Sequence, residues 1–254
     1  MNEQDKSLDI LGIKPLSKSI EIGTSAAFNG AGAFLSRICL PAAEELGLLL
    51  RDRVSAWRAQ NAIEITRRAE KLVCDAADAP LLRAHPRIVA GVIELGSWND
   101  AEEVQQMWAG LLASACDSDG KDDSNLMFLD ILSKLTLSQI RLFDHMCRHA
   151  TKVVTLAGWI SAEAFSMSLE ELKIVTRITD FQRIDLDLDY LRSLGLLIEM
   201  GGGFNQDSTN ANMTPSALAL QMFVRCQGST LDPIAFYDAQ PSKQQQIGVE
   251  SLEF

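Results

Sequence analysis

Two histidines four residues apart are the first candidates for chemistry in this 254-residue chain. His145 and His149 would share one face of a helix, where two imidazoles can hold zinc. A stable zinc site needs a third and a fourth ligand, and the remaining histidine, His85, is distant in sequence. We therefore expect a structural or solvent-facing pair, and we assign no metal ligand.

Two further segments resemble ligand-binding loops but depart from the required pattern. Asp117–Asp119 begins like a calcium loop, yet its glycine comes at the fourth position and Phe128 stands where a bidentate Glu is needed. Gly30–Gly32 begins a dinucleotide-binding motif, but Leu35 replaces its third glycine. The sequence also contains no phosphate-binding P-loop, no nucleophile elbow and no zinc-protease motif. We assign no catalytic residue and no cofactor.

The charge balance argues against a nucleic-acid partner. The chain has 34 acidic and 23 basic residues, for a net charge of -11. Each of the segments 1–79, 80–125, 126–228 and 229–254 is net negative, so none provides an electrostatic footprint for phosphates. Nucleic acid is therefore an unlikely partner.

Composition indicates a folded protein of the cytoplasm. The chain is 47% hydrophobic and 22% charged, which is enough apolar material for a core. Its five cysteines form no CxxC pair and are odd in number, so they predict core residues and neither a zinc ribbon nor a disulfide framework. The first residues carry no secretion signal, and we expect a cytoplasmic location with reduced thiols.

The first half of the chain has helical periodicity. From Pro41, apolar residues recur every three or four positions and predict an amphipathic helix of about 30 residues whose packed face includes Trp57. Pro86 favours the first turn of a shorter helix. Asp100 and Glu103 have the spacing of a capping box ahead of a helix that extends to position 115. The polar run 117–124 predicts a domain boundary, giving a helical region over 1–125.

The second half predicts helices followed by a small β-hairpin. Capping-box spacings at Thr136–Gln139 and Ser168–Glu171 each precede an apolar helical pattern. Strands are expected at Leu196–Met200 and at Met213, on either side of a flexible loop over 201–212. Thr214–Pro215 would then cap a last helix that reaches position 226.

This order of elements is typical of a winged helix. We therefore expect a mainly α protein, with a winged-helix-like domain over 126–228 and a polar disordered tail over 229–254. The candidate recognition helix carries Asp185, Asp187 and Asp189, with only Arg183 and Arg192 to offset them. Three carboxylates oppose approach to DNA phosphates, so we favour a structural or protein-binding use.

Residues 22–36 form an uncharged run rich in Gly and Ala. A membrane-spanning helix needs about 20 apolar residues, and Arg37 and Pro41 end this run too early. We expect a tightly packed buried helix or loop. Its small residues at spacing four also permit close helix contact between two copies of the chain. A further alternative is contact with a membrane on activation.

Four ordered blocks together resemble one protein family, the abortive infection alpha family of bacteria. They are LPAAEELGLLLRDRVSAWRAQN (40–61), EVQQMWAGLLASACDSD (103–119), FLDILSKLTLSQIRLFD (128–144), and LRSLGLL (191–197) with MTPSALALQMFVRC (213–226). The order of the blocks carries the resemblance, because each block alone is unspecific. The family supplies no catalytic residue to transfer to this chain.

The resemblance implies an antiphage defence protein that sacrifices or arrests the infected cell. In view of the absent catalytic motifs, we expect a non-enzymatic sensor or effector that contacts a phage or host protein. Two alternatives stay open: an enzyme with a composite site, and a winged-helix transcriptional regulator.

Overall fold

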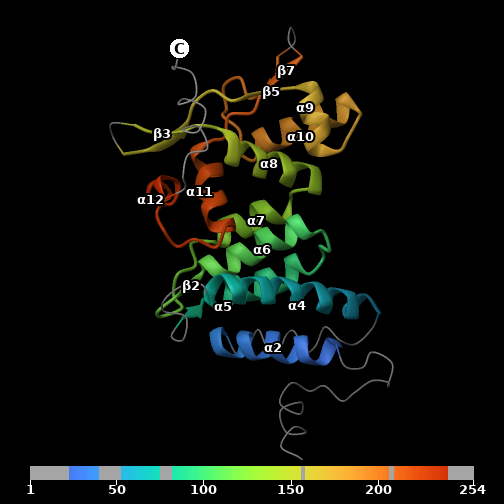
Figure 1. The fold of residues 1–254 in the computed structure, drawn as a ribbon, viewed down its shortest axis with the longest axis vertical. Coiled ribbons are helices and arrows are strands. Elements are labelled where there is room, and N and C mark those ends of the chain that lie inside the picture. Colours follow the sequence, from blue (N-terminus) through green and yellow to red (C-terminus); the bar gives the residue numbers. More distant parts are fainter. Residues whose placement is uncertain (1–22, 40–52, 75–81, 156–157, 206–208, 240–254) are drawn as a thin grey trace, which may run out of the picture.

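The computed structural model describes residues 23–39, 53–74, 82–155, 158–205 and 209–239. These residues form a mainly helical protein with small antiparallel sheets, which confirms the predicted fold class at this level. In Figure 1 the helices follow one another along the long axis, from α2 at one end to α9 and α10 at the other.

Three helices build the N-terminal layers. Helix α2 (Gly23–Ile38) packs on α4 (Arg53–Cys74), and α4 packs on α6 (Glu102–Ser114) (Figure 1). Helix α2 buries Ala31, Phe34, Leu35 and Ile38, the spacing of one helix face. The packed helix expected at residues 22–36 is therefore present over its described part.

Helix α4 confirms the second part of the predicted long helix, whereas residues 40–52 lie outside the described residues. Asn61 and Ile65 are buried as expected. The expectation that Trp57 packs on the same face is wrong: its side chain is 40% exposed and lies against Trp98, with ring centroids 6.4 Å apart.

A π-helical turn separates α4 from α6 in sequence. Pro86 begins α5 (Pro86–Gly91) as predicted, with His85 as the N-cap that accepts from the Arg87 amide. The chain continues without a break into the π-helix η3 (Val92–Gly96). The short strands β1 (Arg83–Ala84) and β2 (Cys116–Asp117) pair antiparallel.

The start of α6 corrects one prediction. Its N-cap is Ala101, which makes no side-chain cap, so Asp100 and Glu103 do not form a capping box. The reason is tertiary: the Glu103 carboxylate accepts from both Nε and Nη2 of Arg141 on α8.

The C-terminal helices are α7 (Leu126–Ser133), α8 (Leu137–His149), α9 (Leu169–Thr176), α10 (Phe181–Ser193), α11 (Ala217–Cys226) and α12 (Pro233–Asp238). Both predicted capping boxes are confirmed. The Thr136 amide donates to Gln139 Oε1 at 2.9 Å, and the Ser168 amide donates to Glu171 Oε2 at 2.7 Å.

The strands lie elsewhere than predicted. Strands β3 (Lys152–Val154) and β4 (Ile160–Ala162) pair as a hairpin, and β5 (Ser166–Ser168), β6 (Gly203–Phe204) and β7 (Asn210–Asn212) form a sheet of order β5-β7-β6. The segment predicted as a loop thus contains β6 and β7. The segment predicted as a strand contributes only a single bridge, from Leu197 to Pro215.

The beginning of α11 also differs from the prediction. Its N-cap is Ser216, whose hydroxyl accepts from the Ala219 amide. Thr214 does not cap the helix, because its hydroxyl instead accepts from the Phe165 amide and donates to Asn212. This hydroxyl therefore joins β7 to the residue preceding β5.

Helix α12 lies in the segment predicted to be a disordered tail. Asp232 caps it by accepting from the Ile234 and Ala235 amides. Phe236 and Tyr237 lie against Phe223 of α11, and the Tyr237 hydroxyl donates to the Leu220 carbonyl at 3.1 Å. These aromatic contacts hold α12 on the protein. Residues 240–254 lie outside the described residues, and the domain limits stay predictions.

A buried carboxylate connects α10 to α8. Asp187 is 1% exposed and accepts from the Ser138 hydroxyl at 2.6 Å and from the Gln139 amide group at 2.9 Å. Arg183 supplies a positive charge 3.5 Å from the same group. A buried charge is tolerated when it is paired and hydrogen-bonded in this way. Of the three aspartates that the sequence placed on a recognition surface, Asp187 instead faces the interior.

Helix α6 approaches the backbone of α11 closely at Gly110. A Cβ atom added there would overlap the backbone carbonyl of Cys226 at the end of α11. Because the obstacle is backbone, it cannot rotate away as a side chain would. Gly110 is thus the position that lets α11 cross α6.

Gly110→Ala is expected to lower the free energy of unfolding by more than about 3 kcal/mol, since overpacking against backbone forces the helices apart. The matched control is Gly30→Ala on α2, where an added Cβ meets nothing within 4 Å. That substitution should stabilise the protein by about 0.5–1 kcal/mol through helix propensity. Urea unfolding measures both, and equal effects of the two substitutions would contradict the proposed close crossing.

Candidate functional site

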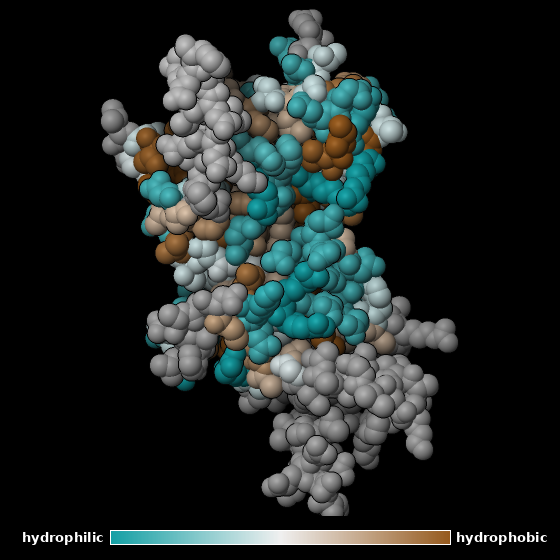
Figure 2. Space-filling model, viewed as in Figure 1, coloured by the Kyte–Doolittle hydropathy of each residue, from teal (hydrophilic) through white to brown (hydrophobic). Residues whose placement is uncertain are grey.

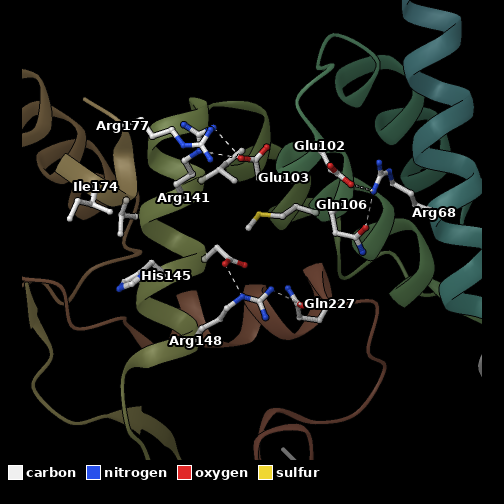
Figure 3. A pocket seen from close by; sticks show the side chains of 14 residues that line it. Arg68, Glu102, Glu103, Gln106, Arg141, His145, Arg148, Ile174, Arg177 and Gln227 are labelled. Atoms are coloured by element: carbon white, nitrogen blue, oxygen red, sulfur yellow. Dashed lines mark hydrogen bonds and ion pairs between the residues drawn. The ribbon is translucent and has the colours of Figure 1, made fainter. Parts of the chain in front are cut away.

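A cleft of about 460 Å³ opens between α4, α6, α8 and α9. Its charged lining consists of four arginines, three carboxylates and a histidine (Figure 3): Arg68, Arg141, Arg148, Arg177, Glu102, Glu103, Asp144 and His145. Its apolar lining is Met107, Ile140, Ile174 and Val175, and Gln106 and Gln227 complete the wall.

Regular helix geometry places these side chains. On α8, Arg141, His145 and Arg148 are separated by four and three residues, so they share one face. Glu102 and Glu103 lie in the first turn of α6. The positive end of the helix dipole there favours their negative charge. Arg177 follows the last turn of α9 as its C-cap.

Three ion pairs line the cleft; the first two join α6 to α4 and to α8, and the third lies within α8. Arg68 lies 3.2 Å from Glu102, Arg141 lies 3.0 Å from Glu103, and Arg148 lies 2.7 Å from Asp144. Figure 3 draws these pairs as dashed lines. Glu102 is 78% exposed, and such a surface pair contributes little to stability, about 0–1 kcal/mol. Arg141 is held more firmly, because it is 16% exposed and also donates to the Thr176 carbonyl.

Arg177 has an unusual backbone conformation. With φ 61° and ψ 30°, it is left-handed, and no other non-glycine residue of the described chain has a positive φ. Glycine is the usual residue at such a helix end because it has no Cβ to strain. The Arg177 guanidinium makes no hydrogen bond or ion pair within the described residues, although its charge contributes to lowering the pKa of Glu103.

Arg68 also carries a hydrogen-bond donor that has no partner within the described residues. Its Nη1 donates to Glu102 and to Gln106, whereas its Nε is buried and has no hydrogen-bond partner in the part of the chain that the structure describes. Buried polar atoms are nearly always paired, so an unpaired one beside a cleft needs an explanation.

The local charges shift the titration of two groups in the cleft. Hydrogen bonds from the start of its own helix and from Arg141 lower the pKa of Glu103, which therefore stays ionised near neutral pH. Burial, followed by the neighbouring His149, lowers the pKa of His145. His145 is thus a neutral imidazole at pH 7.

The histidine pair itself is brought together as the sequence predicted. The rings of His145 and His149 stack with centroids 4.0 Å apart, and His149 Nδ1 donates to the His145 carbonyl at 2.8 Å. Within the described residues, no group of three or more His, Cys, Asp or Glu side chains could hold a metal ion. The Asp117 carboxylate is engaged by the amides of its own loop, at Asp119, Gly120 and Asp122.

The cysteines are mostly core residues, as predicted. Cys39, Cys116, Cys147 and Cys226 are buried, and only Cys74 is exposed. Burial raises the pKa of Cys116 to about 12 and raises the pKa of Cys147 well above its ordinary value. These two thiols are therefore not activated nucleophiles.

The sequence did not reveal the arginine cleft. Its arginines come from α4, α8 and the end of α9, and the large segments that contain them, 1–79 and 126–228, are each net negative. The spacing of Arg141, His145 and Arg148 was the one available signal, since it places three basic side chains on one face. Only the fold adds Arg68 and Arg177 to them.

Comparison with known proteins gives one match. Residues 58–220 match the family model described as abortive infection alpha. The chain belongs to the abortive infection alpha family. The matched range confirms the resemblance seen in the sequence and includes every residue that lines the cleft except Gln227. No curated protein and no solved structure gives a significant match.

The surface of this family member is largely hydrophilic on one face. Figure 2 shows hydrophilic residues extending from the region of α4 towards α9 and α10, with hydrophobic residues exposed in places near the upper helices. Within the described residues, no helix is both long enough and apolar enough to cross a bilayer.

The strained conformation of Arg177 predicts the effect of replacing it. A left-handed conformation costs an L-residue about 1–2 kcal/mol, and glycine would remove this cost. The greater flexibility of glycine in the unfolded chain would cancel about 0.5–1 kcal/mol of the stability gained in this way. Arg177→Gly should therefore raise the free energy of unfolding by about 0.5–1 kcal/mol. Lys173→Gly, in the interior of α9, should lower it by about 1 kcal/mol. Destabilisation by Arg177→Gly in urea unfolding would show that the arginine side chain is itself a structural support.

Proposed function

We propose that this protein defends bacteria against phage by abortive infection, acting as a non-enzymatic sensor or effector that contacts a phage or host protein. The match of residues 58–220 to the abortive infection alpha family is the observation that carries this proposal. Contact rather than catalysis is supported by the buried thiols of Cys116 and Cys147 and by the absence of the common catalytic motifs from the sequence.

Exposed aromatic residues support a protein partner. Trp57 and Trp98 are 40% and 54% exposed, and the Arg58 guanidinium lies 4.4 Å from the Trp98 ring centroid. Trp and Arg are the residue types that most often dominate the binding energy of protein interfaces.

We further propose that the elements from α8 to β7 act as a winged-helix-like unit in protein contact. Their order is one helix, three strands, two helices and two strands, and the last of the three strands, β5, joins the β6–β7 hairpin in one sheet. Against DNA binding, α10 keeps Asp189 exposed and Asp185 half-exposed, although Asp187 faces inward. Nucleic acid therefore stays an unlikely partner in this proposal.

Membrane contact and self-association through residues 22–36 stay predictions. Membrane insertion would require α2 to separate from α4, because Ala31, Phe34 and Leu35 are buried in the described fold. Release of these side chains would expose apolar area at a cost of about 25 cal/mol per Å² unless lipid or a second copy covered it.

Phage challenge of cells with and without the gene tests the defence role. At low multiplicity, the gene should reduce plaque number across part of a phage panel. At high multiplicity, infected cells should fail to recover while releasing fewer phage, because abortive infection sacrifices the cell. The matched control is Gly110→Ala, whose disrupted helix crossing should remove the effect. Equal burst size with and without the gene, for every phage of a broad panel, would overturn the proposal.

A further inference from the structure

The cleft contains more cationic hydrogen-bond donors than its own carboxylates engage. Each arginine carries five N–H donors in a rigid fork. Arg177 uses none of them within the described residues, and the buried Nε of Arg68 is also unpartnered there. Arg141 is different, since Nε, Nη1 and Nη2 all donate to protein oxygens. The free donors thus lie on two walls of one cleft, with a firmly positioned arginine between them.

Phosphate is the ligand that best matches these donors. A planar guanidinium pairs with phosphate through two parallel hydrogen bonds, and a phosphate offers enough oxygens for more than one arginine. Among the carboxylates of the cleft, the one in the weakest pair does not block such a ligand. The most exposed of them, Glu102, forms a solvent-screened ion pair with Arg68. Such a pair contributes little free energy, so a phosphate could replace Glu102 at Arg68 at little cost.

The net charge of the lining also permits an anion. Four arginines face three carboxylates, which gives the cleft a formal charge of +1 in a chain of charge -11. The overall negative charge repels long polyanions, whereas a small anion can enter a site where the local balance is positive. This difference favours a small phosphorylated molecule over nucleic acid.

The dimensions and the apolar wall narrow the ligand class further. A volume of about 460 Å³ is in the range of sites for small molecules and cofactors. Ile174, which is 77% exposed, and the half-buried Val175 line the cleft beside the arginines, whereas Met107 and Ile140 are buried. A flat ring attached to a phosphate would therefore meet suitable chemistry at both ends.

We propose that this cleft binds a small phosphorylated molecule of nucleotide size, with Arg177 as its principal phosphate ligand and Ile174 and Val175 as the apolar contact for its ring. The strained backbone of Arg177 fits this role, because strain of this kind is retained where a side chain must be held in a particular place. The proposal is independent of whether the protein acts in phage defence, since binding is measured on the purified chain.

Calorimetric titration of the full chain tests the proposal with three probes: ADP, pyrophosphate and adenosine. The buffer contains about 150 mM salt and a chelator, so that weak surface attraction is screened. We expect ADP to bind with a Kd below about 1 mM, and pyrophosphate and adenosine each to bind at least about tenfold more weakly.

Variants locate the binding. Arg177→Gly should weaken ADP binding at least about tenfold, because hydrogen bonds to a charged group are lost. The control is Arg67→Gln, one residue from Arg68 on α4 but outside the cleft, which should leave binding unchanged. Thermal unfolding of each variant without ligand verifies that the fold is intact.

Four results would overturn the proposal. Absence of ADP binding at about 1 mM would exclude the site. Equal binding of ADP and adenosine would show that phosphate is not recognised, and equal binding of ADP and pyrophosphate would show that the apolar wall is not used. Unchanged affinity in Arg177→Gly would place any observed binding elsewhere.

Discussion

The crossing of α6 and α11 at Gly110 is the constraint on which the rest of the fold depends. Helix α6 contacts α4 on one side and α7, α8 and α11 on the others, so it connects the N-terminal layers to the C-terminal helices. Because Gly110 has no side chain, the backbone of α11 can approach at Cys226. The same helix begins with Glu102 and Glu103, and its position relative to α8 therefore determines the width of the arginine cleft.

Buried polar contacts fix the elements on either side of this crossing. Asn61 of α4 donates to the Ser97 carbonyl and accepts from Gln105 of α6, which sets the register between these helices. At the other end, Asp187 joins α10 to the first turn of α8. Such groups are costly to bury without partners, so they disfavour shifted packings that hydrophobic contacts alone would tolerate. The arginines of the cleft are consequently presented by elements whose positions are individually fixed.

Local sequence patterns predicted those features that local contacts decide. The capping boxes at Thr136 and Ser168 and the helix start at Pro86 are satisfied within a single turn, and all three are confirmed. The predicted box at Glu103 is wrong because Arg141, 38 residues away, competes for the same carboxylate. The hairpin was misplaced because β7 is held by β5 and by β6, and periodicity in one segment carries no information on such pairing. The cleft was missed for the same reason: its cations converge only after folding.

We propose that the strained conformation of Arg177 serves the defence function of this abortive infection alpha protein through the ligand of the cleft, and not the stability of its fold. The most direct test is protection against phage in cells that express Arg177→Gly, with Arg67→Gln as the matched control and protein levels measured in both. The account predicts that Arg177→Gly accumulates normally but protects at least about tenfold less in plaque counts, which is the size expected when charged hydrogen bonds to a ligand are lost. Arg67→Gln should protect as well as the unmodified protein does. Full protection by Arg177→Gly would contradict the account.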